Sequence, residues 1–186
     1  MRSYANHFTV QPALLFLLFL LSTSSATAQS ADPDLSGLKG VDLGLVLEHD
    51  TESRLGLTNQ EAYKVIAEEL RKAGVRYLPW PTRNTNIGAR FQKMPQDYAM
   101  LYFEVVSVVG PRMDENYVID LRFDLLDRVR LSRDNSKETV ASILKGHQVV
   151  LLTGRGGGAE VLDRLRFMTK QFAANFRASN PETNKR

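Results

Sequence analysis

The pattern of apolar and polar positions predicts a strand followed by a helix at the start of the folded domain. Over residues 38–49, apolar side chains alternate with polar or small ones, which is the period-two pattern of a half-buried strand. Residues 59–73 instead carry apolar side chains at helical spacing. Thr58 and Glu61 form the sequence of a capping box ahead of this helix, and Gly74 can end it in a left-handed conformation.

The next segment predicts a second, short strand and then a long loop. Residues 75–80 are apolar and partly β-branched, as strands are. Strand, helix and strand in this order favour a right-handed crossover, which makes the two strands parallel. Residues 81–95 contain two prolines, one glycine and several Asn and Thr residues, which predicts a loop of unusual length.

Three further strand-like runs predict an antiparallel meander. Turn-forming residues separate these runs, and the last one holds an expected irregularity at Lys145–Gly146. The runs cover residues 98–109, 117–131 and 139–152.

A glycine-rich segment, Gly154–Gly158, leads into a final amphipathic helix. Its apolar face consists of Val161, Leu165, Met168, Phe172 and Phe176. The predicted fold class is therefore α+β, a two-layer sandwich. One βαβ crossover is followed by a three-stranded antiparallel meander and a C-terminal helix, with two helices on one face of a mixed five-stranded sheet.

The first residues have the organisation of a cleavable signal peptide. Arg2 precedes an apolar run at 13–21, which is shorter than the ~20 residues that span a bilayer as a helix. Small residues follow and end in Ala-Thr-Ala at Ala28, so cleavage is expected there, leaving Gln29 first. An uncleaved anchor or a buried helix are the alternatives. The expected regions are a signal peptide at 1–28, a flexible lead-in at 29–37, one domain at 38–179 and a disordered tail at 180–186.

The composition excludes sites that depend on cysteine and argues against a nucleic-acid partner. The chain has no cysteine, which excludes disulfides, thiolate zinc sites and N-terminal lipidation of the kind that lipoproteins carry. Removing the one arginine of residues 1–28 leaves 23 basic and 21 acidic residues, a net charge of +2. So small a balance does not point to a nucleic-acid partner.

Two segments carry candidate ligand-binding residues. Gly154–Ala159 matches G-x-G-x-x-A between a predicted strand and a helix, but the second strand and acidic residue of a dinucleotide site are missing. Arg155 with the amides of Gly156 and Gly157 could still bind an anion at the helix start. Trp80 lies between two prolines at the start of the long loop, either as a binding lip or as a plug over the core edge.

No catalytic set, metal site or cofactor is predicted. The histidines after the signal segment are His49 and His147, which are distant in sequence, and neither belongs to a recognisable hydrolase or zinc motif. Alternating charges around Asp120, Arg122 and Asp124 are interpreted as exposed cross-strand pairs.

The layout resembles small bacterial envelope domains. It is similar in element order to the N-terminal domain of the Tol-system propeller protein and to lipoproteins that activate penicillin-binding proteins. The segments LRKAGVRYL (70–78) and FAANF (172–176) carry this likeness, which also extends to exported proteins of this size. The resemblance implies an envelope location and transfers no functional residue, and the chain departs from the lipoproteins by lacking the lipid-accepting cysteine.

The sequence therefore predicts a periplasmic or secreted, non-enzymatic binding or accessory protein with an envelope protein as its partner. No membrane anchor is expected after signal cleavage, and the oligomeric state is left open. The alternative is a small-ligand carrier or an envelope hydrolase that uses residues 81–95 as a lid, and a third hypothesis is a structural protein without a small ligand.

Overall fold

The computed structural model describes residues 35–79, 87–108, 116–131, 133–153 and 156–181. All of them belong to one compact unit of the chain, 33–186. The predicted signal segment, Trp80 and Arg155 lie outside the described residues.

A mixed five-stranded sheet forms the centre of this unit. Its strands lie in the order β2-β1-β3-β4-β5. The second strand in this order, β1 (Gly40–Leu47), pairs in parallel with the short edge strand β2 (Tyr77–Pro79) on one side and with the central β3 (Tyr98–Val108) on the other. The strands β4 (Asn116–Leu131) and β5 (Asp134–Thr153) continue the sheet with antiparallel pairing. The predicted parallel crossover and antiparallel meander are thus confirmed.

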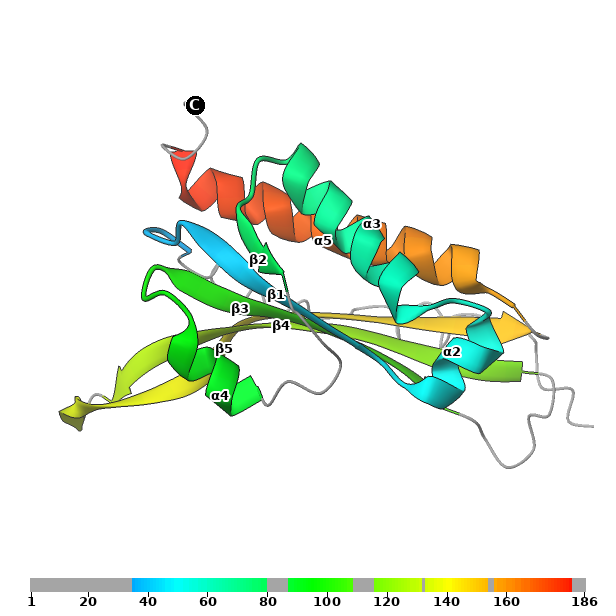
Figure 1. The fold of residues 1–186 in the computed structure, drawn as a ribbon, viewed down its shortest axis with the longest axis horizontal. Helices are drawn as coiled ribbons and strands as arrows, with labels where there is room; N and C mark the ends of the chain where they lie inside the picture. Colours follow the sequence, from blue (N-terminus) through cyan, green and yellow to red (C-terminus); the bar gives the residue numbers. More distant parts are fainter. Residues whose placement is uncertain (1–34, 80–86, 109–115, 132, 154–155, 182–186) are drawn as a thin grey trace, which may run out of the picture. The chain divides into compact units, whose positions relative to one another are not determined.

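Helices α3 (Asn59–Lys72) and α5 (Gly158–Ser179) lie side by side over one face of the sheet (Figure 1). The α+β fold class is therefore confirmed, with these two helices forming the second layer. The predicted capping box of α3 is also present, because the Glu61 amide donates to Thr58 Oγ1 at 3.2 Å and the Thr58 amide donates to Glu61 Oε2 at 2.8 Å.

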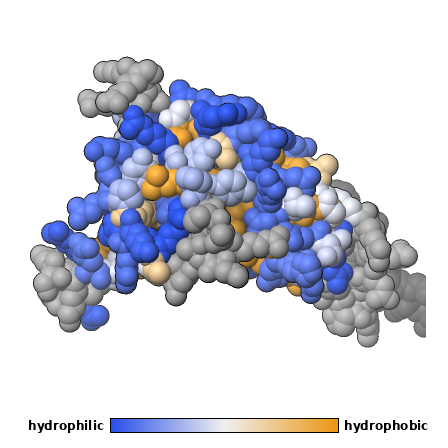
Figure 2. All heavy atoms as spheres, viewed as in Figure 1, coloured by the Kyte–Doolittle hydropathy of each residue, from blue (hydrophilic) through white to orange (hydrophobic). Residues whose placement is uncertain are grey.

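Apolar side chains from the two helices and the sheet meet in one core. Odd-numbered residues along most of β1, β3 and β4 point to this side, and many of them are almost fully buried, for example Leu43, Phe103 and Leu121. Three ring contacts join four phenylalanines, with centroid separations of 5.6 to 6.2 Å. Figure 2, drawn from the same side, shows a mostly hydrophilic surface in which hydrophobic residues appear in small areas between hydrophilic ones.

Two short helices occur where the sequence predicted none. Residues 49–56 follow the first predicted strand and have no predicted element, but α2 (His49–Leu55) forms there. Its buried Thr51 hydroxyl donates to Ser107 Oγ at 3.0 Å and accepts from the Ser107 amide at 2.9 Å. The expected long loop contains α4 (Ile87–Lys93), which lies on the face opposite α3 and α5 (Figure 1).

The folded domain also extends beyond its predicted limits at residues 38 and 179. Leu35 is fully buried, although it belongs to the expected flexible lead-in. Asn180, in the expected disordered tail, accepts from the Gly37 amide at 3.0 Å and donates to the Leu35 carbonyl at 2.8 Å. Residues from the two ends of the domain therefore hold each other in place.

Candidate functional site

The described part of the expected glycine turn is shaped by backbone geometry. Gly156 and Gly157 have φ values of 110° and 91°, which favour glycine because a side chain would be strained there. The Gly156 amide donates to the Arg54 carbonyl of α2 at 3.2 Å. A Cβ atom on Gly157 would lie 2.5 Å from a methyl group of Leu152. These contacts account for both glycines as parts of a tight turn, and anion binding by them stays a prediction.

The hypothesis that residues 81–95 form a lid requires an open cavity beneath them. Side chains of helix α4 instead fill the space between this helix and the sheet. Phe91 and Met94 are buried against the fully buried Met100 of β3, so side chains occupy the region beneath the helix. Arg128 of β4 caps its C-terminal end by donating to the Phe91 and Met94 carbonyls at 2.7 and 2.8 Å. Its guanidinium also lies 5.1 Å from the Phe91 ring centre.

A buried ion pair fixes α4 from its other side. Arg90 donates through Nε to Asp42 Oδ2 at 2.6 Å and through a second nitrogen to Oδ1 and to the Pro79 carbonyl. Asp42 on β1 is only 1% exposed. Two arginines therefore attach α4 to the sheet, which is the arrangement of a fixed cover.

On the sheet face opposite α3 and α5, helix α4 covers one end, and no described helix covers the other. We call this region over β3, β4 and β5 the open face. Register places its side chains in cross-strand rows, with Val108, Val118 and Leu151 in one row and Val106, Asp120 and Val149 in the next. Three of these side chains are well exposed, Val108 by 53%, Val149 by 61% and Leu151 by 64%. The five apolar residues of these two rows form an apolar strip that ends at strand β5.

A group of polar side chains borders the apolar strip. In the adjoining row, Glu104, Arg122 and His147 lie opposite one another on three strands. Asp120 is 7% exposed and forms an ion pair with Arg122, while His147 Nε2 lies 2.5 Å from its Oδ1 atom. Apart from that imidazole, Oδ1 has no hydrogen-bond partner among the described residues.

These neighbours set the acidity of Asp120. Burial alone would raise the pKa of its carboxyl group, but hydrogen bonds from Arg122 and His147 outweigh burial and hold the pKa below its usual range. The pKa of Arg122 is raised in turn by the hydrogen bond to Asp120. The carboxylate therefore stays ionised while it is almost completely covered, and it keeps both partners oriented on the open face.

Acidification tests this interaction. Because the folded pKa is lowered, the contribution of Asp120 to stability is present above the unfolded pKa of about 3.9 and is lost as the pH falls through the folded value. The difference in free energy of unfolding between wild type and Asp120→Asn should therefore shrink between about pH 6 and about pH 2.5 in urea titrations. Asp50→Asn, which removes an exposed carboxyl of α2, is the control. Equal differences for Asp120→Asn at both pH values would contradict the assignment.

The sequence alone did not predict that His147 lies beside Asp120. A register shift at residue 143 changes the alternation along β5. On the sheet face opposite α3 and α5, residues 138–142 therefore present their even positions and residues 145–151 their odd ones. The expected irregularity at Lys145–Gly146 lay close to this bulge. Gly146 itself makes room for the Phe123 ring, which a Cβ atom would approach to 2.0 Å.

Within the described ranges, no three His, Asp or Glu side chains gather where they could hold a metal ion. None of the described helices has the length and hydrophobicity needed to cross a bilayer.

Comparison with solved structures gives a distant similarity. No model of a known protein family matches the chain, and no curated protein matches its sequence. The chain is similar to a solved dodecamer of a PelC variant from Paraburkholderia phytofirmans, with a TM-score of 0.41 and 14% sequence identity. The alignment covers 73% of this chain and 89% of that one. So distant a likeness carries no conclusion about function or assembly.

Proposed function

We propose that this is an exported, non-enzymatic binding or accessory protein of the bacterial cell envelope, and that its protein partner docks on the open face along β5. The apolar strip is the observation that carries this proposal. Single exposed apolar residues are common on protein surfaces, whereas Val108, Val149 and Leu151 belong to neighbouring rows of one face. An apolar area with polar neighbours such as Asp120, Arg122 and His147 has the composition of a protein interface.

The edge of the sheet suggests how the partner binds. Among the described strands, none pairs with the outer edge of β5. Residues 146–153 contain no Lys, Arg, Asp, Glu or Pro, the residues that usually protect an edge strand from further pairing. An extended apolar segment of the partner can therefore add to β5, with main-chain hydrogen bonds along the edge and contacts to Val149 and Leu151.

Position-specific cross-linking tests the docking surface. A photo-activatable residue in place of Leu151 is expected to give one discrete adduct with an envelope protein in intact cells. The matched control is Phe167, which is 49% exposed on α5, away from the open face. Leu151→Glu should abolish co-purification of the adduct protein, and Phe167→Glu should preserve it. Equal labelling from both positions, or an adduct with a second copy of this chain, would contradict the proposal.

Export is tested separately. The protein recovered from the periplasm or medium is expected to begin at Gln29, as N-terminal sequencing or intact mass would show. Recovery of the protein from the cytoplasm with residues 1–28 still attached would overturn the envelope assignment, irrespective of the cross-linking result.

A further inference from the structure

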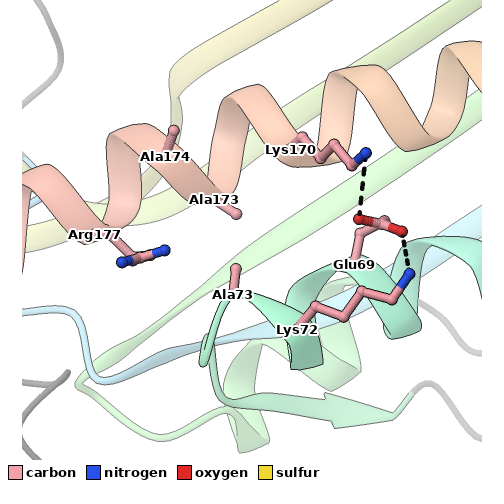
Figure 3. A pocket seen from close by; sticks show the side chains of 7 residues that line it. All are labelled: Glu69, Lys72, Ala73, Lys170, Ala173, Ala174 and Arg177. Atoms are coloured by element: carbon pink, nitrogen blue, oxygen red, sulfur yellow. Dashed lines mark hydrogen bonds and ion pairs between the residues drawn. The ribbon is translucent and has the colours of Figure 1, made fainter.

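A hollow lies between the C-terminal ends of α3 and α5, on the helical layer and therefore separate from the open face. It has a volume of about 250 Å³. Small side chains leave the space open, because Ala73, Ala173 and Ala174 lie where the two helices approach each other. Figure 3 shows Lys72 and Lys170 converging from opposite helices at one end and Arg177 near the other end.

One buried carboxylate organises the cations at the first end. Glu69 is 5% exposed and accepts a hydrogen bond from Lys72 Nζ at 2.7 Å. Lys170 Nζ lies 4.0 Å from the same carboxylate, and Arg166 Nε lies at 3.8 Å while also pairing with Asp163. A single buried charge thus attracts both lysine head groups at this end of the hollow, and it cannot neutralise all of its neighbours.

The other end of the hollow has an uncompensated cation. Within the described residues, no carboxylate lies within 4 Å of Arg177. Lys72, Lys170 and Arg177 together carry three positive charges along the lining, against the one negative charge of Glu69. The hollow is therefore electropositive and has an apolar floor.

We propose that this hollow binds a phosphoryl group, with Lys72, Lys170 and Arg177 as its ligands. Charge complementarity selects an anion, and a phosphoryl group is favoured over a single carboxylate because it offers more acceptor oxygens to several cations. Its several oxygens can accept hydrogen bonds from ammonium groups and from a planar guanidinium when these long side chains turn toward the same point in the hollow. The group belongs either to a free phosphate or phosphomonoester or to the headgroup of a phospholipid.

A simpler role for these cations is to complement the negative ends of α3 and α5. Cations in the last turn of a helix interact favourably with its unpaired carbonyl groups. That role would make stability depend on Lys72 and Arg177, but it would give no response to phosphate. The two roles are therefore separated by a binding measurement rather than by a stability measurement.

The test is a nuclear magnetic resonance titration of the full mature protein with inorganic phosphate, balanced by chloride to constant ionic strength. Saturable shifts are expected at the amides of Ala73, Ala173 and Ala174. Arg177→Gln and Lys170→Gln should each weaken binding about tenfold or more, as expected for loss of a charged hydrogen bond. Arg164→Gln is the control, because Arg164 is on the same helix and pairs with Glu160.

Sedimentation with vesicles distinguishes the two sources of the phosphoryl group. Phosphatidylglycerol vesicles that bind wild type and Arg164→Gln, but not Arg177→Gln, would assign a lipid headgroup. A phosphate response without vesicle binding would assign a free phosphoryl ligand. Two results would overturn the proposal, namely no saturable response to either probe, or equal responses in wild type and Arg177→Gln.

Discussion

Replacing Arg90 with methionine is expected to lower the free energy of unfolding by about 3–5 kcal/mol, the usual cost of removing one member of a buried ion pair. Asp42 would then lie buried beneath α4 without the two hydrogen bonds that Arg90 donates. The Pro79 carbonyl would lose its contact as well. Denaturant titration of the single variant against wild type measures this change.

A double variant separates the charge from the packing. In Asp42→Val with Arg90→Met, no buried charge remains, and apolar pairs of similar size often replace buried ion pairs at little cost. The double variant should therefore recover most of the stability that Arg90→Met loses. If it is as unstable as the single variant, the main role of Arg90 is packing or its contact with Pro79 rather than compensation of Asp42.

Phe172→Ala is expected to cost about 3–5 kcal/mol of stability, because it removes a large buried side chain and leaves a cavity. Phe172 is 1% exposed and contacts the rings of Phe123 and Phe176, at centroid separations of 6.2 and 6.0 Å. It thereby joins α5 to the sheet. Chemical denaturation monitored by circular dichroism checks the value.

The same helix supplies a matched control for this substitution. Phe167 is 49% exposed, so Phe167→Ala removes the same atoms from a position that is about half in water. Its effect should stay within about 0.5 kcal/mol, as for most surface substitutions. Similar losses for both variants would mean that α5 is not packed as described.

The large elements of the fold could be predicted because their patterns are long. The alternation in β1 and the apolar face of α5 each extend over many residues, and the capping box at Thr58 marks the start of α3. Helices α2 and α4 were missed because each has seven residues. Two turns bury few positions, so no period can be recognised, and tertiary contacts such as Thr51 with Ser107 hold the first of them.

The candidate surfaces were harder to predict because they depend on register between distant segments. Asp120 and His147 are both visible in the sequence, but only the pairing of β4 with β5 across a bulge brings them together. The hollow between α3 and α5 likewise combines Lys72 with Arg177, more than a hundred residues away. A single sequence shows each of these residues, but it does not show which of them lie close together in the fold.

The hydrogen bonds of Asn180 couple the unfolding of the two ends of the domain. Asn180, which follows α5, bonds to the backbone at Leu35 and Gly37, 145 and 143 residues away, and also to the Phe176 carbonyl in the last turn of α5. Loss of the last turn of α5 therefore releases the first buried residues of the domain in the same step. Both ends should exchange their amide hydrogens at a common rate, as one cooperative unit rather than two independently fraying termini.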